Sequence, residues 1–384
     1  MKFSTKAVHA GSEPNLKDGG YGDVIPPIHL SSTFARKEVD KPTAGLEYSR
    51  SGNPTRHALE KNLAALENAK YAYAYASGLA AETNVLMTLK TGDHVLAIDD
   101  LYGGTRRLFT KVFDTFGLEF TFADFKDGDT LEQYIQPNTK MIWFESPTNP
   151  LFKIVDIASV TKLAKEKGII TVVDNTFASP YFQNPLDLGA DIVLHSLTKY
   201  IGGHSDVIGG AIMLNDPKIA DRLGFLQNAV GAILSPFDSY SVIRGAKTLA
   251  VRMKQHEENA LKVVEFLGQH KKVKKIYYPG LPSHPGYEIA KKQMRGFAGM
   301  LSFELNSSLE DSVNVIQSLH IPSLAESLGG VESLIEHPAS MTHASVPPEE
   351  RKKIGLEDGL IRLSVGIEDV DDLIEDLEQA FEKI

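Results

Sequence analysis

The chain has 384 residues, 42% of them hydrophobic and 23% charged, which is typical of a globular protein and long enough for two domains. Its 40 basic and 50 acidic residues give a net charge of −10, which argues against a nucleic-acid-binding surface, and the absence of cysteine excludes disulfide bonds and thiol catalysis. No apolar run approaches the ~18 residues of a membrane span and no signal-peptide pattern follows Met1, so we expect a cytoplasmic protein.

Three segments differ in their patterns along the chain. Residues 1–60 contain many Gly, Pro and Ser residues with little periodicity, which predicts an extended N-terminal arm. Residues 61–246 alternate strand-like and helix-like runs, which predicts a large α/β domain with a doubly wound, mainly parallel sheet. Residues 247–384 predict a linker helix and a smaller α/β domain. Strands are expected at 71–76, 94–98, 118–123, 141–144, 169–173, 192–194, 211–214, 300–305 and 361–365, and helices at 78–87, 157–165, 247–269 and 370–384.

The first expected strand leads into Ser77, Gly78 and Leu79, which open a helix. Unpaired backbone N–H groups, a serine hydroxyl and the positive end of the helix dipole together suit a phosphate group. An ordinary helix cap needs Ser77 alone, so the pattern also permits a purely structural role.

Asp174 ends another expected strand and precedes Lys199 by 25 residues, about the length of one strand–crossover–strand unit. The two side chains can therefore reach the same edge of the sheet. Pyridoxal phosphate (PLP) needs an anion against its ring nitrogen, because a protonated ring withdraws electrons most strongly. Taken alone, Asp174 fits a loop or a helix cap, but its pairing with Lys199 favours a cofactor site.

Lys199 follows the short apolar run 192–194, at the strand end where open α/β sheets bind ligands. Partial desolvation there favours the neutral amine, which attacks carbonyl carbons, and PLP is the commonest partner for that chemistry. A surface lysine that caps the following turn is the structural alternative.

Several motifs in the same order resemble the PLP enzymes of cysteine and methionine metabolism, the group that contains cystathionine γ-lyase and cystathionine γ-synthase. The resemblance runs from residue 8 to the last helix. Its most specific motifs are residues 48–55 (YSRSGNPT), 174–177 (DNTF), 196–200 (SLTKY), 326–333 (ESLGGVES) and 361–366 (IRLSVG). It implies the fold-type-I PLP transferase-like fold and a homotetramer made of two dimers, in which the arm crosses to a neighbouring subunit.

The resemblance also implies a set of site residues. Lys199 binds the cofactor, Asp174 pairs with its ring nitrogen and Tyr102 stacks on the ring. For Tyr102 the structural alternative is a half-buried aromatic residue at a helix start. The remaining cofactor contacts are expected from Tyr48 and Arg50 of a neighbouring subunit, from Ser77, Gly78 and Leu79, and from Asn149, Ser196 and Thr198. Surface or turn roles remain open for Arg50, Asn149 and the two hydroxyls.

Arg362 is expected to bind the substrate α-carboxylate, because a charge inside the apolar run 361–365 is costly without a partner. The other substrate contacts implied by the resemblance are Asn149, Ser327, Glu326, Glu47 and Arg107. No metal site is expected, because His337 and His343 lack the ligand spacing of a helix and no H-E-x-x-H motif is present. The sequence also lacks a G-x-G-x-x-G motif after a strand and a nucleotide-binding phosphate loop.

The resemblance implies γ-elimination of cystathionine to cysteine, 2-oxobutyrate and ammonia, with cystathionine γ-synthase activity as the alternative. Methionine γ-lyases usually carry a cysteine where Gly104 stands and an apolar residue where Glu326 stands, and both departures disfavour methionine as the substrate. A non-catalytic member would be expected to lose Lys199, Asp174 or Arg362, and all three are present.

Overall fold

Two β-sheets organise the computed structural model, which describes residues 1–17, 20–344 and 348–384. The seven-stranded sheet has the order β1 (Tyr71–Tyr75), β7 (Gly210–Leu214), β6 (Ile192–Ser196), β5 (Ile170–Asp174), β4 (Thr139–Glu145), β2 (His94–Ile98) and β3 (Glu119–Ala123). Strand β7 runs antiparallel to both of its neighbours, and β2 to β6 are mutually parallel. The predicted α/β architecture with a mainly parallel sheet is confirmed.

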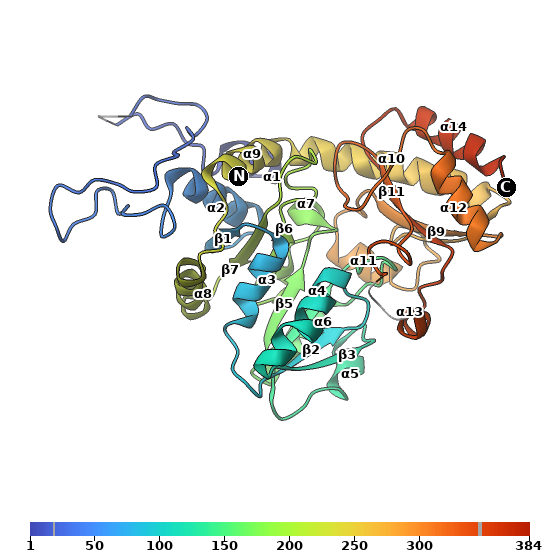
Figure 1. The fold of residues 1–384 in the computed structure, drawn as a ribbon, viewed down its shortest axis with the longest axis horizontal. Coiled ribbons are helices and arrows are strands. Elements are labelled where there is room, and N and C mark those ends of the chain that lie inside the picture. Colours follow the sequence, from blue (N-terminus) through green and yellow to red (C-terminus); the bar gives the residue numbers. More distant parts are fainter. Residues whose placement is uncertain (18–19, 345–347) are drawn as a thin grey trace.

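Helices cover both faces of this sheet (Figure 1). Successive side chains of a strand point to opposite faces, so Ile192 and Leu194 join one core cluster and Val193 joins the other. The first cluster includes residues of α3 (Gly78–Leu86), α4 (Gly103–Lys111), α6 (Ile157–Glu166) and α8 (Pro217–Val230). The second includes residues of α1 (Phe3–His9), α2 (Pro54–Leu66), α7 (Ser179–Phe182), α9 (Pro236–Lys247) and α10 (Leu249–Gln269). Burial on both faces explains why these strands are short continuous apolar runs.

The five-stranded sheet has the order β10 (Ser323–Leu324), β11 (Leu334–Glu336), β12 (Leu360–Ser364), β9 (Met300–Leu305) and β8 (Val273–Tyr277). Its core also contains residues of α10, α12 (Leu309–Ser318) and α14 (Val370–Phe381). The long helix α10 runs from the large sheet to the small one (Figure 1). We propose that the two sheets mark the two domains, with the predicted boundary at residue 246. The remaining elements are α5 (Gly128–Glu132), α11 (Tyr287–Gln293), α13 (Pro348–Ile354) and the 3₁₀ turns η1 (Phe113–Phe116) and η2 (Pro185–Leu188).

The structure adds helices to the predicted arm and confirms the predicted linker helix. The predicted arm contains α1 and the start of α2, since the Asn53 side chain accepts hydrogen bonds from two N–H groups and Pro54 occupies the first helical position. The predicted helix 247–269 coincides with α10 to within two residues. It begins at Leu249 rather than at Lys247, because α9 ends at Lys247 and Thr248 has non-helical dihedral angles. Between α1 and α2 the described chain extends away from the body, as expected for an arm (Figure 1). Within the described ranges no helix has the length and apolarity needed to cross a bilayer.

Candidate active site

A cavity of about 380 Å³ lies where strands β4, β5 and β6 end. Its volume is within the range of small-molecule sites. Residues from both sheets and their loops form its wall. The predicted site residues that line it are Ser77, Gly78, Leu79, Tyr102, Asn149, Asp174, Ser196, Thr198, Lys199, Glu326, Ser327 and Arg362. The fold therefore assembles in one place most of the residues that the sequence analysis selected.

Lys199 lies in the turn that follows β6, and its Nζ donates a hydrogen bond to Ser327 Oγ over 2.6 Å. Burial and the positive charge of Arg362 lower the pKa of Lys199 to about 8. Carboxylates of Glu336 and Glu326 act in the opposite direction but more weakly. With this pKa, roughly a tenth of the amine is neutral, and therefore nucleophilic, at pH 7.

The lowered pKa of Lys199 predicts how the protein takes up a carbonyl cofactor. Because the neutral amine attacks, the rate of PLP capture by cofactor-free protein should rise with pH and level off above about pH 8 rather than near 10.5. Arg362→Met removes a charge that lowers the pKa, so its profile should move to higher pH. Stopped-flow absorbance measures both pH profiles. Identical profiles would show that the charge of Arg362 does not lower the pKa of Lys199.

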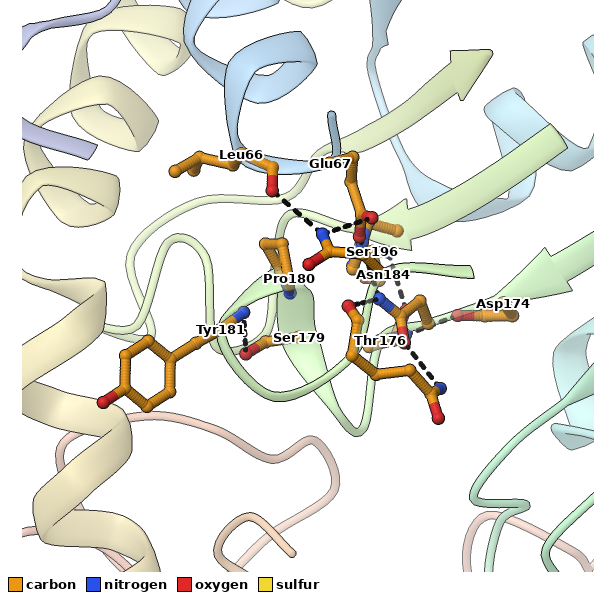
Figure 2. A network of polar contacts seen from close by, with 12 residues as sticks. Leu66, Glu67, Asp174, Thr176, Ser179, Pro180, Tyr181, Asn184 and Ser196 are labelled. Carbon is orange, nitrogen blue, oxygen red and sulfur yellow. Dashed lines mark hydrogen bonds and ion pairs between the residues drawn. The ribbon is translucent and has the colours of Figure 1, made fainter. Parts of the chain in front are cut away.

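Asp174 lies at the end of β5 and faces the cavity. Its Oδ1 accepts a hydrogen bond from the Thr176 N–H over 2.9 Å, while Thr176 Oγ1 accepts one from the Ser196 N–H over 2.9 Å. Figure 2 shows these three residues at the ends of the two neighbouring strands. The bonds join the carboxylate to the strand that leads to Lys199, which fixes their relative positions.

A buried polar cluster around Glu67 contacts the segments at the ends of β5 and β6 (Figure 2). Glu67 Oε1 lies 2.5 Å from His195 Nε2 and accepts a bond from Asn175 over 2.8 Å, and Glu67 Oε2 accepts one from Asn184 over 3.1 Å. His195 directly precedes Ser196, and Asn175 directly follows Asp174. Hydrogen bonds between buried groups hold backbone segments in one arrangement, so this cluster positions both strand ends.

Besides Glu326, the carboxyl groups of Asp174, Glu82 and Glu145 line the cavity. Desolvation and the neighbouring Asp174 raise the pKa values of Glu82 and Glu145 well above their ordinary value. Desolvation also raises the pKa of Asp174, but its bonds to Thr176 and the field of His195 oppose that shift. Since adjacent carboxylates cannot all ionise, we expect the charge on Asp174 and protons on the two glutamates.

Arg362 forms the centre of a second buried polar group. Its Nη1 lies 2.9 Å from Glu336 Oε1 and donates to Asn149 Oδ1 over 2.9 Å, and its Nη2 donates to the Ser327 carbonyl over 2.8 Å. Glu336 stands opposite Arg362 in the antiparallel pair of β11 and β12, which places the two charges side by side. The pair holds a guanidinium at the cavity wall, where it can bind a carboxylate.

The amino end of α3 forms the opposite part of the cavity wall. Ser77 caps the helix by accepting a hydrogen bond from the Ala80 N–H over 3.0 Å. A Cβ on Gly78 would lie 3.4 Å from the Ser196 Cβ, and one on Gly210 would lie 2.2 Å from the Ser77 carbonyl oxygen. Of these two positions, a Cβ would clash only at Gly210, so this glycine lets β7 approach the start of α3 closely. The backbone N–H groups and hydroxyls at the helix start surround a site that suits phosphate.

These features fit PLP. The α3 terminus with Ser196 and Thr198 would hold its phosphate, Asp174 its ring nitrogen, the partly exposed Tyr102 one face of its ring and Lys199 its carbonyl carbon. The backbone N–H of Tyr102 donates a hydrogen bond to Glu145 Oε1 over 2.8 Å. Within the described residues, no group of His, Asp and Glu side chains is arranged for a metal ion.

Four predicted site residues lie outside this cavity. Arg50 donates to Asn228 over 3.2 Å and lies 5.0 Å from the centre of the Tyr48 ring, while Glu47 pairs with Arg36 over 2.7 Å. These arm residues cannot serve the cavity of their own chain in this arrangement. Arg107 does not line the cavity either, although its charge lowers the pKa of Tyr102 against the stronger effect of burial.

Sequence reasoning missed several cavity or supporting residues, among them Glu82, Glu145 and Glu336. Glu82 follows Gly78 by four positions, so helical spacing places both on one face and could have revealed it. Glu145 ends β4 as Asp174 ends β5, and the same strand-end argument applies to it. Glu336 had no such signal, because its role depends on the register that pairs it with Arg362.

Comparisons with known proteins agree with this geometry. A family model described as Cys/Met metabolism PLP-dependent enzyme matches residues 4–382. The chain is 52% identical to a cystathionine γ-lyase of Dictyostelium discoideum, over 100% of this chain and 98% of that protein. It is 54% identical to a cystathionine β-lyase of Coxiella burnetii, over 98% and 97%. A crystal structure of cystathionine γ-lyase from Lactobacillus plantarum complexed with L-serine superposes with a TM-score of 0.96 at 47% identity, covering 100% of this chain and 99% of that one.

Proposed function

The chain belongs to the Cys/Met metabolism family of PLP-dependent enzymes, and we propose that it is a cystathionine γ-lyase. The observation that carries the proposal is one cavity lined by the Lys199 amine, the Arg362 guanidinium and the Glu326 carboxylate. Cystathionine is an amino acid at both ends, so it offers an α-carboxylate to the arginine and a distal ammonium to the glutamate.

PLP, when bound, withdraws electrons from the substrate carbon next to it and makes neighbouring protons removable. Arg362, held by Glu336, orients the substrate by its carboxylate. The Lys199 amine then moves protons at substrate Cα and Cβ, a task that suits its lowered pKa. Expulsion of sulfur from Cγ yields cysteine, and addition of water to the remaining unsaturated fragment yields 2-oxobutyrate and ammonia.

Product analysis tests this assignment. Purified enzyme with cystathionine should release cysteine and 2-oxobutyrate in equal amounts, as resolved by chromatography. Homocysteine and pyruvate would instead mean cleavage at Cβ, the candidate favoured by identity to the Coxiella burnetii β-lyase. Faster formation of cystathionine from an O-acylhomoserine and cysteine would identify a γ-synthase.

We predict that Glu326 selects cystathionine over methionine. Glu326→Val removes the carboxylate that would contact the distal ammonium, and kcat/KM for cystathionine should fall about tenfold more than kcat/KM for methionine. Glu332→Val is the matched control, because Glu332 belongs to the same motif but does not line the cavity. Equal losses on both substrates would assign Glu326 a structural role.

We further propose a homotetramer with active sites shared between the two subunits of each dimer. Tyr48 and Arg50 lie on the exposed arm and outside their own chain's cavity, which suits contacts with the cofactor phosphate of a neighbour. A guanidinium is well matched to that phosphate.

Subunit mixing provides the measurement. Arg50→Ala and Lys199→Ala proteins, each inactive, are unfolded and refolded together in equal amounts. In a mixed dimer one site carries both defects and the other carries none. Random pairing makes about half of the dimers mixed, each with one intact site of two, so about a quarter of wild-type activity should return. An inactive mixture despite demonstrated exchange would place Arg50 at its own subunit's site.

A further inference from the structure

A second cavity, of about 790 Å³, lies between the loops that follow β3 and β4 and the segment from α10 to α11. Strand β8 and the end of α13 complete its wall. Among the described residues none lines both this cavity and the candidate active site. Its volume is ample for a small organic molecule.

The wall of the second cavity combines an apolar floor with a basic rim. The floor includes the buried side chains of Phe125, Leu151 and Ile154. Four lysines lie at the rim, and Asp124 is the one carboxylate among its described lining residues. Lys153 already binds Asp124 over 3.1 Å, and Lys274 binds Glu304 over 2.8 Å.

The other two rim lysines, Lys126 and Lys275, form no ion pair with any of the described residues. Lys275 Nζ lies 3.0 Å from Tyr277 Oη and 4.1 Å from the centre of its ring. The cavity therefore offers two cations beside an apolar floor. That combination is complementary to a molecule with a flat apolar body and one negative group.

One wall segment connects the two cavities. In residues 148–153, Thr148 and Leu151 donate hydrogen bonds to Asp100, over 2.5 and 3.3 Å, and Lys153 binds Asp99 over 2.9 Å. The same segment contains Asn149, which accepts from Arg362 in the active site. Asp99 and Asp100 closely precede Tyr102 in the sequence. The segment 148–153 is therefore linked to two active-site residues, Asn149 within it and Tyr102 through the two aspartates.

We propose that the second cavity is an effector site for a small organic anion, with the anionic group between Lys126 and Lys275 and the apolar body on the floor. A ligand that binds one arrangement of segment 148–153 more tightly changes the population of that arrangement and thereby the kinetics at Asn149 and Tyr102.

Calorimetric titration of the cofactor-loaded enzyme with anilinonaphthalene sulfonate, an apolar aromatic anion, tests binding. Gly268→Trp should weaken it more than tenfold, because a Cβ on this α10 residue meets Ile276 Cδ1 at an ordinary 3.8 Å and the indole can fill the cavity. The control Gln269→Trp, on the next residue and outside the lining, should bind normally. Equal affinity in the three proteins would place the probe elsewhere and overturn the proposal.

Two further measurements complete the test. Lys126→Gln with Lys275→Gln should weaken the probe about fivefold, and the control Lys271→Gln less than twofold. Saturating probe should change the kcat/KM of the wild type for cystathionine at least twofold. It should leave the kcat/KM of Gly268→Trp unchanged. Binding without any kinetic change would overturn the effector role, and failure of the cystathionine reaction itself would leave the binding measurements intact.

Discussion

Lys199→Ala should lower the rate of cystathionine cleavage at least ~10³-fold, because it removes both the nucleophile for the cofactor and the group that moves protons. The variant should also lose the visible absorbance of lysine-bound cofactor. The structure supplies the reason: the amine lies in the cavity, on the turn after β6, with a pKa lowered to about 8 by burial and by Arg362. Steady-state assays and absorbance spectra measure the two effects.

Two controls separate chemistry from folding. Lys165→Ala removes an exposed lysine of α6 and should retain wild-type activity. Added methylamine should restore part of the lost rate in Lys199→Ala, because a small amine can occupy the vacated space and move the proton. Near-normal turnover of Lys199→Ala without added amine would overturn the assignment of Lys199.

Strands were the most predictable part of the fold. The expected strands 94–98 and 300–305 coincide with β2 and β9, because apolar runs bounded by turn residues have few alternatives to a buried strand. The direction of β7 could not be predicted, since an apolar run carries no information about its orientation. Strand β8 was missed because its two consecutive lysines interrupt the apolar alternation of this exposed edge strand.

The candidate site was predictable where a polar residue ends or interrupts an apolar run. Lys199, Asp174 and Arg362 all satisfy this condition, and the structure places them in one cavity. Partners that depend on tertiary register, such as Glu336, were not predictable, because nothing in its own segment indicates the strand that it faces. The contribution of Arg50 is likewise beyond a single chain, and it stays a prediction until subunits are mixed.

The second large effect concerns the charge of Asp174 among three neighbouring carboxyl groups. Glu82 and Glu145 have pKa values raised well above normal by desolvation and by Asp174 itself, so they are expected to stay neutral. Asp174 alone combines hydrogen bonds from Thr176 with the favourable field of His195. Of these three carboxyl groups, Asp174 at the end of β5 consequently provides the one localised anion for a protonated ring nitrogen.

Asp174→Asn should therefore lower kcat about 10²- to 10³-fold while the protein remains folded, because the amide keeps the shape and the bond from the Thr176 N–H but loses the charge that sustains electron withdrawal. Asp191→Asn is the matched control. Asp191 accepts bonds from Thr171 at the other end of the same strand pair, over 2.8 Å, and its loss should affect thermal stability but not kcat. Wild-type kcat in Asp174→Asn would show that the anion is not needed, and an equal loss in both variants would assign the effect to folding.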